Sequence, residues 1–550
     1  MRRPWRMLAD ALAAQGYPTL RFDYPGTGDS LGETADLTAL DQLKTSVLRA
    51  AEVLRAHTGA RRIVLVGQGL GASLAALMAA ELGAAATVLL APVVRGREFL
   101  RELSVWGITV SETMQLENDA GPGAIAGFEM PDALRTELAG LDISAVEGTA
   151  PAVLLVGRGR PTEARLSERL RALGAQVAEA PYAGYDEAVT NPTSGRPPRA
   201  TIEAAVRWIA ERVAPEPGGR AEPWRAPAIL EDPEFVETTV RFGADDHLVG
   251  VLCEPRAARR GATVLLLSAG GDAHTGWARG AVEAARALAR DGVASFRMDA
   301  TDVGDASGPL SDAPVRLYDE RHIADARQGF DWLLARGFGP VLPVGRCSGA
   351  FAAFNAAARD ERIGDIILVN QLRYIWERDG SYELASEKVG HYRKQAKNPA
   401  KLFMRWMRGE LDLDVALAKL SSATIALTRA ILRGQARARR QQIRETFGGL
   451  QERGVRIQLL ISRDREAHEV FRQFFGAEGD RLRRYGDLSL TFLEGADHAL
   501  TPKAARMALL ETIRRAALSS PSPSGAVGAE QAAAEPQDFA LGTAGGLLPT

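Results

Sequence analysis

The chain has 550 residues and a mass of 58.9 kDa, more than one ordinary domain, so two domains are expected. Apolar residues make up 46% and charged residues 25%, which excludes a disordered or fibrous chain. No window of about 18 uncharged apolar residues occurs, and Asp10 and Gln15 interrupt the apolar region that a secretory signal would need. Two cysteines are too few for a disulfide framework or a four-cysteine zinc site. The sequence predicts a soluble, cytoplasmic protein with no cofactor and no metal.

The net charge of −2 hides an uneven distribution. Residues 388–444 hold 14 Lys and Arg against three acidic residues, a net charge of +11, so the rest of the chain carries −13. The near-neutral total argues against a nucleic-acid-binding protein, and the basic segment lacks aromatic residues spaced for base stacking.

Two similar halves follow each other along the chain. Each begins with an amphipathic helix, at 7–15 and 280–290, followed by a short β-run that ends near Asp23 or Asp299. Apolar strands then alternate with helices, at 63–66, 87–91, 152–156 and 176–179 and again at 341–344, 365–369, 455–461 and 488–493. Uninterrupted Val, Ile and Leu runs between helices indicate parallel strands buried on both faces, and hence an α/β architecture.

Composition places the domain boundaries. Residues 1–213 and 235–518 are the two predicted domains, 214–234 is a Pro- and Gly-rich linker, and 519–550 is a predicted disordered tail. The first half begins inside the helix that should follow a third strand. Its first three strands and one loop are therefore expected to be missing, through degeneration or a start codon placed too late. The edge strand left exposed would need cover, which the second half could supply.

Each half also has a strand that runs into a Gly-rich turn and then a helix. In Gly345-Arg346-Cys347-Ser348-Gly349, the flanking glycines relieve clashes while the central residue is held above the sheet. This segment resembles the nucleophile elbow of α/β-hydrolases, with cysteine where serine is usual. The run Asp23-Tyr24-Pro25-Gly26-Thr27-Gly28-Asp29-Ser30 resembles the serine-aminopeptidase (S33) branch. More narrowly, both halves resemble hydrolases encoded beside bacterial exopolysaccharide and exosortase systems, over residues 1–213 and 235–517.

The resemblance implies two tandem α/β-hydrolase domains and, in the second, a triad in the order nucleophile, acid, histidine. Cys347, Asp464 and His498 occupy these three stations. His498 would deprotonate the thiol, and Asp464 would hold the imidazole in the required tautomer. The oxyanion hole would use the N–H groups of Ser348 and Gly271.

Alternatives remain for several of these residues. Cys347 could be a small buried hydrophobe, and Ser348 could be the nucleophile, although it stands one residue late in the elbow. Glu466 and Asp487 lie near Asp464 and could supply the acid. His498 could be a plain surface residue. Two further residues complete the set: His274 is a possible substrate contact or a loop-packing residue, and Cys253 is predicted to be structural.

The first half departs from the pattern at every station. Gly69 stands in the position of Cys347, Gly159 in that of Asp464, and Glu187 in that of His498. A glycine has no side chain to donate or accept a proton, so the first half is predicted to be an inactive hydrolase-like domain.

Residues 371–447 hold the basic segment and occupy the place of a cap over the active site. The segment is either a solvated helix face or a binding surface for an anionic partner: CoA, acyl carrier protein, an acidic glycan or a lipid surface. The sequence as a whole predicts an enzyme that acts on acyl esters or acyl thioesters, either as a hydrolase or as an acyltransferase. The resemblance implies a role in the metabolism of exopolysaccharide or of a lipid-linked glycan. The alternatives are a non-catalytic binding or scaffold protein and, more weakly, a peptidase.

Overall fold

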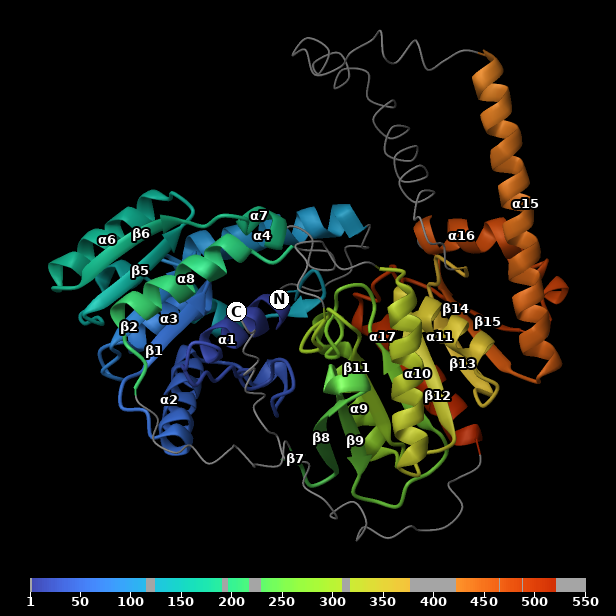
Figure 1. Ribbon diagram of the computed structural model, residues 1–550, viewed down its shortest axis with the longest axis horizontal. Coiled ribbons are helices and arrows are strands. Elements are labelled where there is room, and N and C mark those ends of the chain that lie inside the picture. The colour runs from blue at the N-terminus through green and yellow to red at the C-terminus, as the bar shows by residue number, and fades with distance from the viewer. Residues whose placement is uncertain are drawn as a thin grey trace, which may run out of the picture.

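The computed structural model describes residues 2–114, 124–189, 196–216, 229–308, 317–375, 422–463, 465–486 and 488–520. These residues form two α/β lobes, one from each half of the sequence (Figure 1). The predicted α/β class is confirmed. Among the described helices, none is both long enough and apolar enough to span a bilayer.

The first lobe has a four-stranded parallel sheet in the order β1-β2-β5-β6. Every residue of β2 is buried, because helices cover both faces of the sheet. The strands are β1 (Val64–Gln68), β2 (Ala86–Leu90), β5 (Ala152–Gly157) and β6 (Gln176–Pro181), with a small hairpin of β3 (Ala124–Ile125) and β4 (Phe128–Glu129). The helices are α1 (Arg2–Ala13), α2 (Leu40–Thr58), α3 (Leu70–Met78), α4 (Gly96–Met114), α5 (Asp132–Gly140), α6 (Pro161–Ala172), α7 (Tyr185–Val189) and α8 (Arg199–Arg212).

The second lobe has a nine-stranded sheet in the order β15-β14-β13-β12-β10-β11-β9-β8-β7. Six neighbouring strands, from β15 to β11, run parallel, and β9 is antiparallel to both of its neighbours. The strands are β7 (Ile229–Glu231), β8 (Phe235–Phe242), β9 (Leu248–Pro255), β10 (Thr263–Leu267), β11 (Ser295–Asp299), β12 (Val341–Arg346), β13 (Asp365–Val369), β14 (Arg456–Ser462) and β15 (Ser489–Leu493). The helices are α9 (Gly280–Arg290), α10 (Glu320–Ala335), α11 (Ser348–Arg359), α15 (Ser422–Glu452), α16 (Arg465–Phe475) and α17 (Lys503–Ser519).

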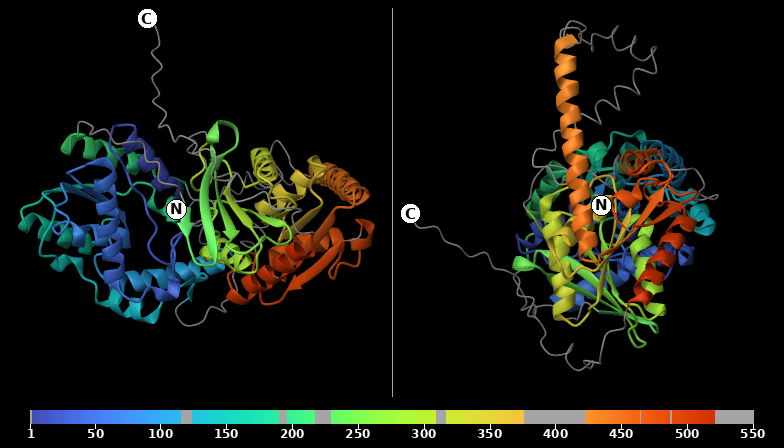
Figure 2. Two further views of the ribbon diagram at one scale, coloured as in Figure 1. Left: turned by 90° about the horizontal axis from the view of Figure 1, so that it is seen from below. Right: turned by 90° about the vertical axis from the view of Figure 1, so that its right-hand side faces the viewer.

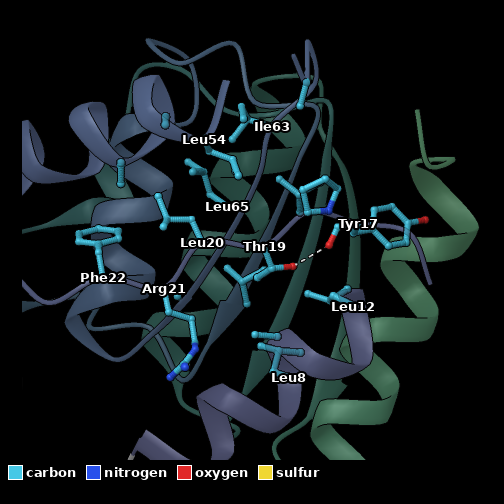
Figure 3. A pocket seen from close by; sticks show the side chains of 18 of the residues that line it. Leu8, Leu12, Tyr17, Thr19, Leu20, Arg21, Phe22, Leu54, Ile63 and Leu65 are labelled. Carbon is cyan, nitrogen blue, oxygen red and sulfur yellow. Dashed lines mark hydrogen bonds between the residues drawn. The ribbon is translucent and has the colours of Figure 1, made fainter. Parts of the chain in front are cut away.

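The β-run predicted to end at Asp23 is wrong as a strand, because residues 17–24 have no regular structure. In the second lobe, the corresponding β11 does not pair with β12, since β10 lies between them. The described part of the first lobe has no counterpart of β10, so residues 17–24 have no neighbouring strand to bond. A cavity of about 1200 Å³ lies there instead (Figure 3). The second lobe does not provide the expected cover: Asp305 is its sole described residue in the cavity lining.

The two lobes meet at the first-lobe loop that follows Asp23, close to α1 (Figures 1 and 2). Arg279 donates a hydrogen bond to the carbonyl oxygen of Gly28 at 3.0 Å, and Arg286 donates to that of Asp29 at 2.7 Å. Arg2, on α1, pairs with Asp305 at 3.0 Å. Because the two second-lobe arginines bind backbone carbonyls, they recognise the path of this loop independently of its side chains.

His274 lies at the centre of this interface and is almost fully buried. Its Nδ1 lies 2.8 Å from a carboxylate oxygen of Asp299, and its Nε2 lies 2.8 Å from one of Asp29. Burial opposes the charged imidazole, but the carboxylates of Asp299 and Asp29 outweigh it and raise the pKa of His274 to about 10. His274 is therefore an imidazolium at neutral pH and packs the loop. With both ring nitrogens engaged, it is poorly placed for the substrate contact that was the other expectation.

We expect Asp29→Asn to weaken the attachment of the lobes by roughly 2–3 kcal/mol, because it removes one carboxylate partner from the buried cations of His274 and Arg297 and from Arg2. The pKa of His274 is raised above its unfolded value of about 6.5, so its stabilisation is complete below that pH. The stabilisation is lost as the pH rises through about 10, and in the variant the loss should begin at lower pH. Urea unfolding from pH 7 to 10.5 measures both effects.

The matched control is Asp10→Asn, which removes an exposed i,i+4 partner of Arg6 and should cost less than about 0.5 kcal/mol. Equal unfolding midpoints for Asp29→Asn and Asp10→Asn would contradict the role assigned to the Asp29 carboxylate.

Candidate active site

Cys347 stands alone between β12 and α11, in a strained backbone conformation with φ 53° and ψ −114°. The strand can turn so sharply into the helix because the residues two positions before and two positions after Cys347 are glycines. A Cβ on Gly345 would lie 2.2 Å from the carbonyl of Gly349, and one on Gly349 would lie 2.7 Å from the carbonyl oxygen of Leu267. The turn holds the partly exposed Cys347 thiol above the end of the sheet.

The first lobe repeats this turn without a reactive side chain. Gly69 has φ 57° and ψ −123°, and a Cβ on Gly67 would lie 2.2 Å from the carbonyl oxygen of Gly71. Gly159 follows β5, and Glu187 is exposed on α7. The first lobe thus keeps the backbone conformation of the elbow but has no nucleophilic side chain at the turn.

Sequence reasoning missed a side chain that lies beside Cys347 and a second one that packs on the first. The Tyr318 hydroxyl lies 3.6 Å from the Cys347 sulfur, and the Arg373 guanidinium stacks over the Tyr318 ring at 4.8 Å. Tyr318 precedes α10 and belongs to no motif, so nothing in its sequence context marks it. Arg373 follows the carboxyl end of β13, which is where parallel sheets commonly place binding residues.

The loop after β10 is tied to the elbow. The Gly270 N–H donates to the Ser348 hydroxyl oxygen at 2.6 Å, and Arg346 pairs with Asp272 at 2.9 Å. The buried Ser348 hydroxyl therefore serves the loop, which disfavours it as a nucleophile. Among the described residues, the N–H groups of Ser348 and Gly271 have no hydrogen-bond acceptor. Two donors of this kind are what an oxyanion hole requires.

His498 is held through its backbone. Its carbonyl oxygen accepts hydrogen bonds from Asn370 at 3.1 Å and from Arg346, the neighbour of Cys347, at 3.3 Å. Asn370 also donates to the Ser462 hydroxyl at 2.8 Å and was not anticipated from the sequence. These contacts bring the His498 loop up against the elbow. The predicted acid Asp464 lies outside the described residues.

His498 is partly exposed, but its Nδ1 is buried, and within the described ranges that nitrogen has no hydrogen-bond partner. Burial and the positive charge of Arg346 lower the pKa of His498 to about 3. The imidazole is therefore neutral at physiological pH, but a pKa this low makes it a weak base, and a carboxylate at its Nδ1 would have to raise the pKa before it could take a proton from a thiol. Of the alternatives for the acid, Asp487 lies outside the described residues, and the side chain of Glu466 is not among those described.

The second cysteine is unreactive. Cys253 is fully buried on β9, with its sulfur 3.6 Å from the carbonyl oxygen of Ala285. Burial raises the pKa of the Cys253 thiol to about 12, so almost none of it is thiolate at neutral pH.

The predicted basic cap is described only in part. Residues 376–421, and with them most of the +11 segment, lie outside the described residues, as does the tail from 521. α15 covers the end of the segment and extends away from the sheet (Figure 1). Arg437, Arg440 and Arg444 on this helix are exposed.

Comparisons with known proteins agree with the resemblance predicted from the motifs. Residues 5–123 match the family model of serine aminopeptidase, S33, which confirms that resemblance. Similar solved structures include dienelactone hydrolase from Anabaena variabilis (13% identity, 52% of this chain and 99% of that chain, TM-score 0.31) and proline iminopeptidase from Mycobacterium smegmatis (15%, 52% and 99%, 0.33). Carboxyl esterase 2 from Tuber melanosporum is a third (14%, 60% and 99%, 0.32). No protein of curated function matches the sequence.

We expect His498→Gln to make the protein more resistant to acid. Between pH 6.5 and 3, the unfolded chain binds a proton at this position and the folded chain does not, so folding stability falls as the pH falls through this range. At pH 5 the loss is about 2 kcal/mol relative to pH 7, and glutamine abolishes it. Urea unfolding at pH 7 and pH 5 gives the difference.

His57→Gln, at an exposed histidine on α2, is the control and should keep the pH dependence of the wild type. A wild-type pH dependence in His498→Gln as well would mean that His498 is not held neutral in the fold.

Proposed function

We propose that the second lobe is an acyl-ester or acyl-thioester hydrolase or an acyltransferase that works through Cys347. The observation that carries this proposal is the combination at the elbow: a partly exposed thiol on a strained turn, followed directly by Ser348, to whose hydroxyl oxygen the neighbouring residue of Gly271, Gly270, donates a hydrogen bond. A reactive side chain in a strained conformation is typical of covalent catalysis on carbonyl compounds.

The proposed reaction has two steps. His498 removes the proton from the Cys347 thiol, the sulfur attacks the acyl carbonyl carbon, and the carbonyl oxygen becomes an oxyanion that accepts from Ser348 and Gly271. The bond to the leaving alcohol or thiol then breaks, and the imidazolium returns the proton to the leaving group. Water or a hydroxyl acceptor attacks the resulting thioester, with His498 again as base, and releases the acyl group. Asp464 would hold the imidazole.

The neighbours of Cys347 support this chemistry. The Tyr318 hydroxyl can donate a hydrogen bond to the sulfur, which favours the thiolate, and Arg373 places a positive charge over the Tyr318 ring. Gly271 belongs to the loop that His274 anchors to Asp29. The first lobe would then contribute by holding the oxyanion loop in place, without chemistry of its own.

The acceptor decides between hydrolysis and transfer. A thioester retains reactivity toward hydroxyl groups, so an acyltransferase fits a cysteine nucleophile as well as an esterase does. The resemblance to proteins of exopolysaccharide loci favours a glycan or its lipid-linked precursor as acceptor. We also propose that the basic segment is the docking region for an anionic carrier. The same proposal places the protein in the cytoplasm.

We expect wild-type protein to turn over members of a panel of acyl esters and acyl thioesters, and Cys347→Ala to lose at least 10³-fold in kcat/KM. Cys347→Ser tests whether the site needs sulfur specifically, since His498 must then activate an alcohol of higher pKa. Release of the acyl group is measured with and without a glycan acceptor. Full turnover by Cys347→Ala would refute the mechanism.

We expect a thiol-directed acylating probe to label Cys347 and to leave Cys253 untouched in the folded protein, because burial keeps the Cys253 thiol protonated. Labelling should be saturable and strongly reduced in His498→Ala. Peptide mapping by mass spectrometry identifies the modified cysteine. Absence of labelling at Cys347 would favour the alternative function, a non-catalytic binding or scaffold protein.

A further inference from the structure

A short hairpin of the first lobe contacts the second lobe at the turn of residues 497–501, which carries His498 (the His498 turn). Strands β3 and β4 pair Ile125 with Phe128 and leave Ala126 and Gly127 as a two-residue tip. Both tip residues are buried, although each strand has only two residues. A hairpin this short is marginally stable by itself, so its position depends on what the tip contacts.

The first tip residue is bound to the second lobe through Trp277. The indole N–H of Trp277 donates a hydrogen bond to the carbonyl oxygen of Ala126 at 2.8 Å, in a buried position. The rings of Trp277 and Phe128 lie 5.4 Å apart, centroid to centroid. Ala126 and Trp277 belong to one buried apolar cluster with Ala499. Because Ala499 directly follows His498, this cluster joins the hairpin to the His498 turn.

The second tip residue packs against the end of the same turn. A Cβ on Gly127 would lie 2.5 Å from the Cγ2 methyl group of Thr501 and 3.2 Å from the carbonyl oxygen of that residue. Gly127 has a φ of 84°, a conformation that glycine adopts without the steric cost of a side chain. The absence of a side chain therefore permits the tip conformation and also lets the hairpin backbone approach Thr501.

The backbone is strained on both sides of this contact. In the His498 turn, the N–H of Leu500 donates to the carbonyl oxygen of Asp497 at 3.2 Å, and the N–H of Thr501 donates to the Asp497 carboxylate at 2.9 Å. Leu500 has a φ of 56°, an outlier for a bulky residue, and Ala126 at the hairpin tip has a φ of 50°. Strained conformations of this kind persist only where the surrounding structure fixes them.

The place of the hairpin in the chain favours a role toward the other lobe. The hairpin lies between β2 and β5, the counterparts of β13 and β14, which is where the second lobe has residues 371–447. The first lobe has no nucleophile for such an insertion to cover, since Gly69 stands at its elbow. Its insertion instead places Ala126 and Gly127 against the second lobe.

We propose that the β3–β4 hairpin is a positioning element for the active site of the second lobe. Its tip holds the His498 turn at Ala499 and Thr501, whereas two side chains of the second lobe hold the same turn at the carbonyl oxygen of His498. Together these contacts fix the imidazole relative to the Cys347 elbow. This inference rests on the proposed function, because it gives the hairpin the task of aligning the base.

Gly127→Ala, in the full-length protein, is the decisive variant, because its methyl group would overlap that of Thr501. We expect amide hydrogen exchange at Leu500 and Thr501, whose N–H groups close the turn, to become roughly tenfold faster. With an ester that the wild type turns over, kcat should fall roughly tenfold and KM should change little, since the hairpin contacts the turn of the base and not the substrate.

Gly174→Ala is the matched control. Gly174 follows α6 and has a φ of 89°, and a Cβ on it would have nothing within 4 Å. This variant carries the backbone cost of alanine at positive φ without any new contact. Exchange at the His498 turn and turnover should therefore stay at their wild-type values.

A second change tests the contact itself. Thr501→Ser removes the methyl group that the new side chain of Gly127→Ala would strike. The double variant should therefore recover the exchange rates and the kcat of Thr501→Ser alone. General destabilisation of the first lobe would not be reversed by a change in the second lobe.

Equal exchange at the His498 turn in Gly127→Ala and Gly174→Ala would overturn the proposal. A double variant no closer to the wild type than Gly127→Ala would overturn it as well. Exchange is measured without substrate, so absence of turnover in the wild type would count against the proposed function alone and would leave this test of the hairpin intact.

Discussion

When a strand passes directly into a helix through one residue, that residue needs a positive φ. The backbone around the turn also comes so close that a Cβ built on Gly345 or Gly349 would lie only 2.2 Å or 2.7 Å from the nearest backbone atom. Gly345 and Gly349 meet this need around Cys347, and Gly67 meets it before Gly69. The position of the thiol and the direction of the Ser348 N–H follow from this turn. So does the place of β10, against which Gly349 packs.

The second constraint is electrostatic. His274 carries a buried positive charge that is tolerable only between Asp299 of its own lobe and Asp29 of the other. The same histidine belongs to the loop that holds Gly271. Through Asp29 and His274, the first lobe therefore helps to hold the loop that carries Gly271 of the proposed oxyanion hole. A change in the conformation of the Asp29 loop would be expected to move Gly271.

Part of the site was accessible to sequence reasoning because it is local. The elbow is defined by five consecutive residues, and its glycines can be interpreted without a fold. Tyr318 and Arg373 could not be predicted in this way, since Tyr318 reaches Cys347 from the residues before α10 and Arg373 packs on Tyr318 from the segment after β13. Asn370 could not be predicted either, because its amide donates to the backbone carbonyl of His498, 128 positions away in the chain.

The sequence by itself determined the α/β class, the positions of the buried strands and the loss of reactive side chains in the first half, because apolar runs and glycine spacing are local properties. Only the tertiary structure decided that residues 17–24 are not a strand and that His274 is an ion-paired interface residue. A β-strand exists only when a neighbour supplies its hydrogen bonds, and a buried histidine takes its charge from the carboxylates around it. Both depend on partners that are distant in the chain.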